Sequence, residues 1–257
     1  MPRYRLNLRY DGSDFHGWQI QNNAPSVQDS LQKALSILLR EPCEIVGCGR
    51  TDTGVHAHYY VAHFDSLVLK PDNFGQFGSL DQLTYRLNHL LPESIYILDC
   101  MEVSDDFHAR FTATKRGYKY FLESQKNPFN SKYSWHFPHD LDLIAMNNAA
   151  CLMLGKHNFQ SFCKGETPNN SYDCEVFKAE WQKVKAIGLG SDQIVFHIEA
   201  NRFLRNMVRA TVGTLLLVGR HKITLEVFQR ILDAKNRSDA GNSVPAKGLF
   251  LWSVEYE

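Results

Sequence analysis

Residues 3–10 read Arg-Tyr-Arg-Leu-Asn-Leu-Arg-Tyr, a strict alternation of polar or charged with apolar side chains. This period of two predicts a half-buried β-strand whose outer face is basic. A turn-rich stretch follows, and Ser26 with Asp29 three positions later forms a capping box for a helix over about residues 27–38. The amino-terminal segment therefore contributes both a strand and a helix.

The same mixture continues through both halves of the chain. Apolar periodicity predicts strands over residues 44–48, 55–64, 94–103, 118–123, 174–186, 193–199 and 249–256, and helices over 80–91, 140–154, 203–218 and 224–234. Such a mixture is typical of the α+β class. The sequence indicates a domain boundary near residues 104–112, so we expect two domains, residues 1–105 and residues 106–257.

Composition excludes several classes of protein. The chain has 257 residues, 44% of them hydrophobic, and its 28 Lys and Arg balance 28 Asp and Glu, which excludes disordered and supercharged proteins. Six scattered cysteines without a CxxC motif predict reduced thiols rather than a zinc ribbon. The longest uncharged apolar stretch, residues 210–219, is too short to span a membrane. We therefore expect a cytoplasmic protein with no membrane partner.

The densest group of chemically useful residues is residues 47–56, Gly-Cys-Gly-Arg-Thr-Asp-Thr-Gly-Val-His. Its three glycines permit a tight loop between two predicted strands, and this loop would present the Asp52 carboxylate. Arg50 is near enough in sequence to pair with Asp52, and a guanidinium favours the ionised carboxylate, which suits a nucleophile or base. The same two residues equally suit a structural pair that braces a turn.

Three histidines near this loop raise the alternative of a metal hydrolase. His56, His58 and His63 would bind the metal with Asp52 as a fourth ligand. In an extended strand, however, His63 points to the opposite face from His56 and His58, so we expect no metal site. A glycosidase is also disfavoured, because it usually needs two carboxylates and one stands out here.

Two stretches concentrate basic residues that the overall charge balance hides. Residues 108–120 and 201–222 contain no acidic residue. Both stretches combine positive charge with aromatic residues, which is typical of proteins that bind RNA with exposed bases. A solvated basic face is the alternative. Within the predicted helix 203–218 and its start, Arg202, Arg205 and Arg209 are spaced to share a face. The candidate contacts to RNA phosphate are Arg110, Arg116, Arg202, Arg205 and Arg209.

Five motifs, in order along nearly the whole chain, resemble those of the tRNA pseudouridine synthase A family. They are Tyr10-Asp-Gly-Ser-Asp-Phe-His-Gly-Trp-Gln-Ile-Gln21, Gly49-Arg-Thr-Asp-Thr-Gly-Val-His-Ala57, Phe107-His-Ala-Arg-Phe111 with Arg116-Gly-Tyr118, Met207-Val-Arg209, and Pro245-Ala-Lys-Gly-Leu249. The chain departs from the family pattern at Thr53, where alanine is usual, and at Ala210, where a polar residue is common. Neither departure removes a catalytic group.

The resemblance implies an isomerase without cofactor that converts uridine to pseudouridine in the anticodon stem-loop of tRNA, at positions 38–40. It also implies a homodimer and two α+β domains, with largely antiparallel sheets and a catalytic cleft between them. By the same resemblance Asp52 is the catalytic aspartate, Arg50 its loop partner and Tyr118 the aromatic ring beside the target uracil. Leu249, together with Lys247 in the same motif, would contact the substrate. The alternative is an RNA-binding module that keeps the basic surfaces without catalysis.

Overall fold

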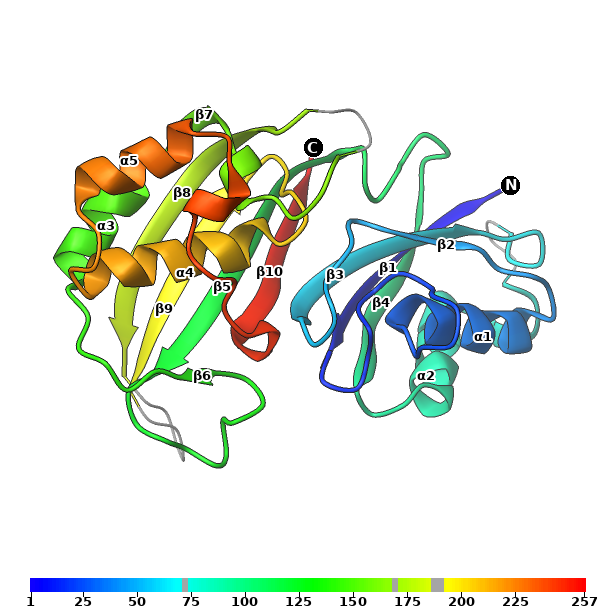
Figure 1. Ribbon diagram of the computed structural model, residues 1–257. Helices are drawn as coiled ribbons and strands as arrows, with labels where there is room; N and C mark the ends of the chain where they lie inside the picture. The colour runs from blue at the N-terminus through cyan, green and yellow to red at the C-terminus, as the bar shows by residue number, and fades with distance from the viewer. Residues whose placement is uncertain (71–73, 168–170, 186–191) are drawn as a thin grey trace. The chain divides into compact units, whose positions relative to one another are not determined.

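The computed structural model describes residues 1–70, 74–167, 171–185 and 192–257 (Figure 1). The helices and strands follow in the order β1 (Arg3–Tyr10), α1 (Val27–Leu39), β2 (Ile45–Gly47), β3 (His56–Asp65), α2 (Leu80–Leu90), β4 (Ile95–Val103), β5 (Ala113–Glu123), β6 (Trp135–His136), α3 (Leu143–Cys151), β7 (Gly155–Asn158), β8 (Asp173–Val184), β9 (Gln193–Ala200), α4 (Met207–Gly219), α5 (Leu225–Asp233) and β10 (Leu249–Tyr256). Short 3₁₀ turns at residues 75–77, 160–162, 237–239 and 246–248 complete the described chain.

The chain forms two compact units. Unit 1 comprises residues 1–114 and 251–257, and unit 2 comprises residues 115–250. No helix of the described residues is long and apolar enough to cross a membrane.

Unit 1 is a sheet with helices α1 and α2 on one face (Figure 1). Its strands follow the order β4-β1-β3-β10, with β2 beside β3, and the β1–β3, β1–β4 and β2–β3 pairs are antiparallel. The apolar side chains of β1 that the alternation predicted to be buried are all inside, with Leu6 and Leu8 fully buried. Helix α1 begins at the predicted cap, where Ser26 accepts a hydrogen bond from the Asp29 N–H at 3.3 Å.

Unit 2 repeats this layered plan with strands β5-β9-β8-β7 and helices α3, α4 and α5. The β5–β9, β8–β9 and β7–β8 pairs are antiparallel, and the two-residue strand β6 runs parallel to β5. Tyr120, Phe196 and Trp181 form one row across β5, β9 and β8 and lie in the core. The α+β class with largely antiparallel sheets is thus confirmed. Strands β6 and β7 were not predicted, because they are short and lack an apolar alternation.

Helix α4 begins at Met207, not at residue 203 as predicted. Asn206, the residue before it, has a left-handed backbone conformation with φ of 65°, which cannot continue a helix backwards. The Asn206 side chain donates a hydrogen bond to Ser243, and this contact with a distant segment holds the turn. Arg202 and Arg205 therefore precede the helix, and the prediction that they share a helical face with Arg209 is wrong.

Candidate active site

Residues 48–55 form the loop between β2 and β3 that was expected to present Asp52. The turn inside it closes by a 3.1 Å hydrogen bond from the Val55 N–H to the Asp52 carbonyl oxygen, and Gly54 adopts a φ of 75°. Asp52 is half-buried and Arg50 is exposed. The backbone thus holds Asp52 on a tight turn at the surface of unit 1. The pairing of Arg50 with Asp52, and the catalytic roles of both, stay predictions.

A second loop, residues 11–18, fastens the Asp52 loop along its backbone. The Trp18 N–H donates to the Thr51 carbonyl oxygen at 3.4 Å, and the Gly54 N–H donates to the Phe15 carbonyl oxygen at 3.2 Å. The hydroxyl groups of Tyr10 and Thr51 lie 2.9 Å apart. These contacts bracket Asp52 on both sides, so the loop is positioned before any substrate arrives.

Two glycines make this close approach possible. A Cβ atom on Gly12 would lie 2.0 Å from the Val55 carbonyl oxygen, and one on Gly17 would lie 2.2 Å from the Thr51 carbonyl oxygen. Gly17 also has a φ of 88°, which disfavours any other residue. From sequence, residues 11–25 were predicted to be a turn-rich stretch and residues 10–21 matched a family motif, but no contact with the Asp52 loop was predicted. The closely spaced Gly12, Gly17 and Trp18 were the sequence signal for this contact between residues 11–18 and the Asp52 loop, which we call the clamp.

An aromatic cluster packs against the same loop. Trp18 and Tyr60 stack with ring centroids 4.1 Å apart, and the Tyr60 hydroxyl donates to the Gly49 carbonyl oxygen. A Cβ atom on Gly47 would lie 2.1 Å from the Tyr60 hydroxyl oxygen, so Gly47 gives these rings their space. The glycines of the motif therefore serve packing as well as conformational freedom.

The three histidines that suggested a metal have other contacts. His56 is buried, and its Nδ1 lies 3.0 Å from both the Gly12 nitrogen and Asp11 Oδ1. A ring protonated only on Nε2 accepts from the Gly12 N–H, whereas a proton on Nδ1 is shared with Asp11, so the tautomer selects between these contacts. His58 stacks on Trp252 at 4.1 Å. In the described part of the chain, no three His, Cys, Asp or Glu side chains group as metal ligands would.

Arg110 belongs to unit 1, on a turn held at several points. His108 Nδ1 accepts from the backbone N–H groups of Arg110 and Phe111, each at 3.2 Å. Ala109 lies between His108 and Arg110. Its N–H donates to His63 Nδ1 at 3.1 Å, and its carbonyl oxygen accepts from the Tyr256 hydroxyl at 2.7 Å. This turn places the Arg110 guanidinium carbon 5.4 Å from the Phe111 ring centre.

The contact of His63 with this turn predicts a pH effect on stability. Burial, followed by the charges of Arg3 and His108, lowers the pKa of His63 from 6.5 to about 4. The unfolded chain binds more protons between these pH values, so stability falls as the pH drops from about 6.5 towards 4. We expect His63 to account for a loss of about 2 kcal/mol between pH 7 and pH 5.

Denaturant unfolding of wild type and His63→Gln at both pH values measures this contribution. The substitution lowers stability at pH 7 but should make the drop on acidification smaller by about 2 kcal/mol. An equal drop in both proteins would show that His63 does not titrate in this way.

In unit 2, Tyr118 and Arg116 occupy β5 and contact the segment that precedes α4. The Tyr118 ring meets the Phe203 ring edge-on, with centroids 4.9 Å apart and planes at 82°. Arg116 donates from Nη1 to the Asn201 carbonyl oxygen at 2.9 Å. Tyr118 is half-buried.

The three arginines expected at the RNA surface lie along one segment of unit 2. Arg202 is half-buried beside Asn201, and Arg205 is exposed, with its carbonyl oxygen accepting from the Lys164 N–H at 3.0 Å. Arg209 on α4 donates from Nε to the Val244 carbonyl oxygen at 2.8 Å. The segment therefore joins Arg116 on β5 to Val244, the residue before the carboxy-terminal motif.

That motif, residues 245–249, is packed against the core of unit 2. The buried Tyr120 donates its hydroxyl proton to the Pro245 carbonyl oxygen at 2.8 Å, and burial raises the pKa of Tyr120. A Cβ atom on Gly248 would lie 2.9 Å from the Tyr120 ring. Leu249 is 5% exposed at the start of β10, and the Lys247 ammonium donates to the Ser131 carbonyl oxygen at 2.9 Å.

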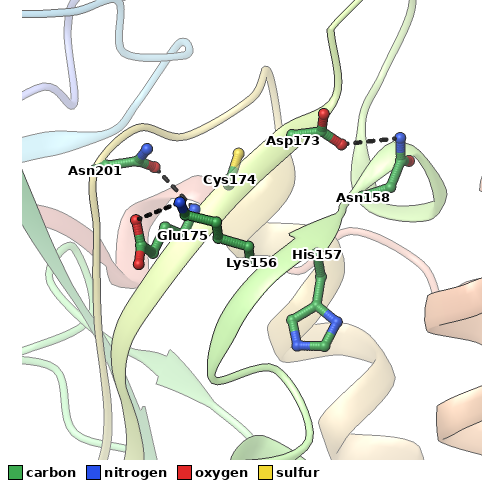
Figure 2. A pocket seen from close by; sticks show the side chains of 7 residues that line it. All are labelled: Lys156, His157, Asn158, Asp173, Cys174, Glu175 and Asn201. Carbon is green, nitrogen blue, oxygen red and sulfur yellow. Dashed lines mark hydrogen bonds and ion pairs between the residues drawn. The ribbon is translucent and has the colours of Figure 1, made fainter.

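A cavity of about 330 Å³ lies elsewhere, along the β7–β8 edge of unit 2 (Figure 2). None of the predicted site residues lines it; its walls are Lys156, His157, Asn158, Asp173, Cys174, Glu175 and Asn201. Its lining side chains largely engage one another or the backbone: Asn201 Oδ1 accepts from the Glu175 N–H at 2.9 Å, and Asn158 donates to Asp173 at 3.4 Å. Asn201 links this cavity to Arg116, which donates to its carbonyl oxygen.

The predicted site residues thus fall into two groups. Arg50, Asp52 and Arg110 belong to unit 1, and the others, Arg116, Tyr118, Arg202, Arg205, Arg209, Lys247 and Leu249, belong to unit 2. Within each unit, backbone contacts position them. Substrate engagement of each group stays a prediction.

Comparison with known proteins identifies the family. A family profile described as tRNA pseudouridine synthase matches residues 149–257. A Bacteroides thetaiotaomicron protein named tRNA pseudouridine synthase A is 46% identical over the whole chain and 91% of its own length. Proteins of the same name from Bacteroides fragilis and Anoxybacillus flavithermus are 44% and 37% identical over the whole chain, covering 97% and 100% of their own lengths. With identity of this extent from end to end, the chain belongs to the tRNA pseudouridine synthase A family.

Proposed function

We propose that this enzyme, which isomerises uridine to pseudouridine in tRNA as its family does, acts at positions 38–40 of the anticodon stem-loop with Asp52 as its catalytic group. The observation that carries the proposal is the Asp52 loop, whose turn is fixed by backbone contacts from residues 11–18. A binding module has no need of such a preorganised carboxylate. The enzyme family leaves that alternative without support.

The reaction breaks the N1–C1′ bond, turns the uracil and forms a C5–C1′ bond. The proton at C5 leaves, and N1 gains a proton, so no electrons are exchanged with another molecule. Asp52 acts by attacking the sugar, by attacking the uracil, or by taking a sugar proton to give a glycal. In each route the carboxylate must be ionised and must meet a nucleoside that has left the base stack.

Unit 2 supplies the groups that hold the extruded nucleoside. We assign the ring of the half-buried Tyr118 to stack on the uracil, with Leu249 in the wall of the pocket. Flipping a base costs a few kcal/mol, which stacking and phosphate contacts offset. The phosphate contacts come from Arg116, Arg202, Arg205, Arg209 and Lys247 of unit 2, and unit 1 adds Arg110.

Tyr118→Phe separates the ring from the hydroxyl. If the hydroxyl assists removal of the C5 proton, we expect the single-turnover rate to fall about 10²-fold or more with tRNA affinity nearly unchanged. Tyr118→Leu should in addition weaken binding, because stacking is lost. An unchanged rate in Tyr118→Phe would assign only the ring to the reaction.

The position of modification is tested by incubating the protein with unmodified tRNA transcripts and mapping pseudouridine at each nucleotide. We expect product at residues 38, 39 or 40 wherever a transcript carries uridine there, and none when that uridine is replaced by cytidine. Pseudouridine confined to another arm of the tRNA would contradict the anticodon assignment but not the isomerase activity.

We also propose a cytoplasmic homodimer in which residues 1–105 and 106–257 form the two domains around a catalytic cleft. The family resemblance supports this arrangement, and the candidate residues of the two domains, Asp52 in the first and Tyr118 in the second, suit a substrate that spans them. Light scattering of the purified protein, alone and with tRNA, measures the assembly. A monomer in both samples would exclude the dimer.

A further inference from the structure

The loop between β5 and β6, residues 124–134, is an exposed surface without an acidic residue. Its sequence is Ser-Gln-Lys-Asn-Pro-Phe-Asn-Ser-Lys-Tyr-Ser. Phe129 is 66% exposed and Tyr133 is 41% exposed, and both Lys126 and Lys132 are exposed. Large aromatic side chains usually lie inside, so this combination of exposed rings and lysines points to a binding surface.

Hydrogen bonds to the buried Glu123 hold the loop in place at its base. Glu123 is 2% exposed, and its Oε1 accepts from the Asn130 and Gln193 side-chain amides, each at 2.8 Å. The Asn130 carbonyl oxygen then accepts from the backbone N–H groups of Tyr133 at 2.8 Å and Ser134 at 3.0 Å. Phe129, next to Asn130, is therefore presented from a fixed backbone, which lowers the entropy cost of binding through its ring.

The same loop contacts the motif that contains Leu249. The Lys247 ammonium donates to the Ser131 carbonyl oxygen at 2.9 Å, and the Tyr133 ring centre lies 6.5 Å from that of Phe250. Both partners belong to unit 2. The loop thus places two more lysines and an exposed aromatic ring beside the carboxy-terminal motif.

The chemistry of this surface favours RNA over a protein partner. Exposed lysines attract phosphate, and an exposed aromatic ring stacks on any unpaired base. A protein interface of this kind would be expected to be depleted in lysine at its centre. An anticodon loop offers both phosphates and unpaired bases.

We propose that residues 124–134 form a second tRNA contact beside the target nucleotide, in which Phe129 stacks on an unpaired base and Lys126 and Lys132 contact phosphates. The proposal rests on the proposed function, since it takes the substrate to be the anticodon arm. It assigns no chemical step to the loop. Its effect is therefore on tRNA affinity rather than on the rate of the bound complex.

The stacking contact is tested with Phe129→Ala, Phe129→Leu and Phe129→Trp in tRNA filter binding and single-turnover assays. Loss of the ring should weaken binding about 5- to 100-fold in the Ala and Leu variants, and Trp should restore it. The rate at saturating protein should stay as in wild type. Ile144→Ala, at a 77% exposed apolar residue of α3 in the same unit, is the matched control and should bind normally.

The phosphate contacts are tested through the salt dependence of binding. Lys126→Gln and Lys132→Gln should each reduce the slope of log affinity against log salt by about 0.7 to 0.9. Lys156→Gln, at a lysine whose side chain is 79% exposed on β7, should leave the slope unchanged. Thermal unfolding of every variant shows that the fold is intact.

Three results would overturn the inference. They are wild-type affinity in Phe129→Leu, unchanged salt slopes in both lysine variants, or a loss of assembly with normal tRNA binding in Phe129→Ala, which would assign the ring to a protein contact. If the wild type forms pseudouridine and these variants bind tRNA normally, only the loop inference fails. If the loop variants weaken tRNA binding but no pseudouridine forms at positions 38–40, the proposed position fails and the RNA contact stands.

Discussion

Asp52→Asn should abolish pseudouridine formation while the protein remains folded and binds tRNA nearly as wild type. The amide has almost the shape of the carboxylate but is neither a nucleophile nor a base. Asp52 is half-buried at the surface of unit 1, and the asparagine amide keeps an oxygen that can accept hydrogen bonds. We expect the single-turnover rate to fall on the order of 10⁴-fold or more, as happens when other enzymes lose a catalytic nucleophile.

The measurement is a single-turnover assay with protein in excess over tRNA, accompanied by filter binding. Asp233→Asn, which changes an exposed carboxylate at the end of α5, is the control for loss of one negative charge. Turnover within tenfold of wild type in Asp52→Asn would remove Asp52 from the reaction.

Gly12→Ala should destabilise the protein and stop turnover, although residue 12 carries no catalytic group. A Cβ atom there would lie 2.0 Å from the Val55 carbonyl oxygen, and backbone atoms cannot yield as a flexible side chain can. We expect a loss of about 3 kcal/mol in the free energy of unfolding, at the upper end for overpacking. Since the Val55 N–H closes the turn at Asp52, moving Val55 also moves the carboxylate.

Gly49→Ala is a closely matched control because Gly49 lies in the Asp52 loop itself. A Cβ atom there would meet nothing within 4 Å. We therefore expect Gly49→Ala to change stability by less than about 1 kcal/mol and to keep most activity. Urea unfolding and turnover at saturating protein compare the two variants. Equal behaviour would show that the two loops do not form the clamp described above.

Much of the fold was predictable because a strand or helix that is buried on one face repeats its apolar residues at a regular spacing in the sequence. The alternation in residues 3–10 and the capping box at Ser26 both predicted local structure that the folded chain contains. The start of α4 was not predictable in this way. It depends on the left-handed conformation of Asn206 and on its contact with Ser243, a residue far away in sequence.

The candidate site was likewise predictable from the sequence only in part. The glycines around Asp52 predicted a tight loop between strands, and the structure has that loop. The clamp by residues 11–18 was missed, because periodicity says nothing about which two loops meet. The closeness of Gly12 to Val55 and of Gly17 to Thr51 exists only in three dimensions.

A crystal structure of Asp52→Asn bound to a tRNA with uridine at the target position tests the central claim most directly. We predict that the target nucleoside is out of its stack, with its uracil against the Tyr118 ring and the position 52 amide about 3 to 3.5 Å from the atom that Asp52 attacks or deprotonates. A target uridine that remains stacked in the RNA, or one bound far from position 52, would contradict the account.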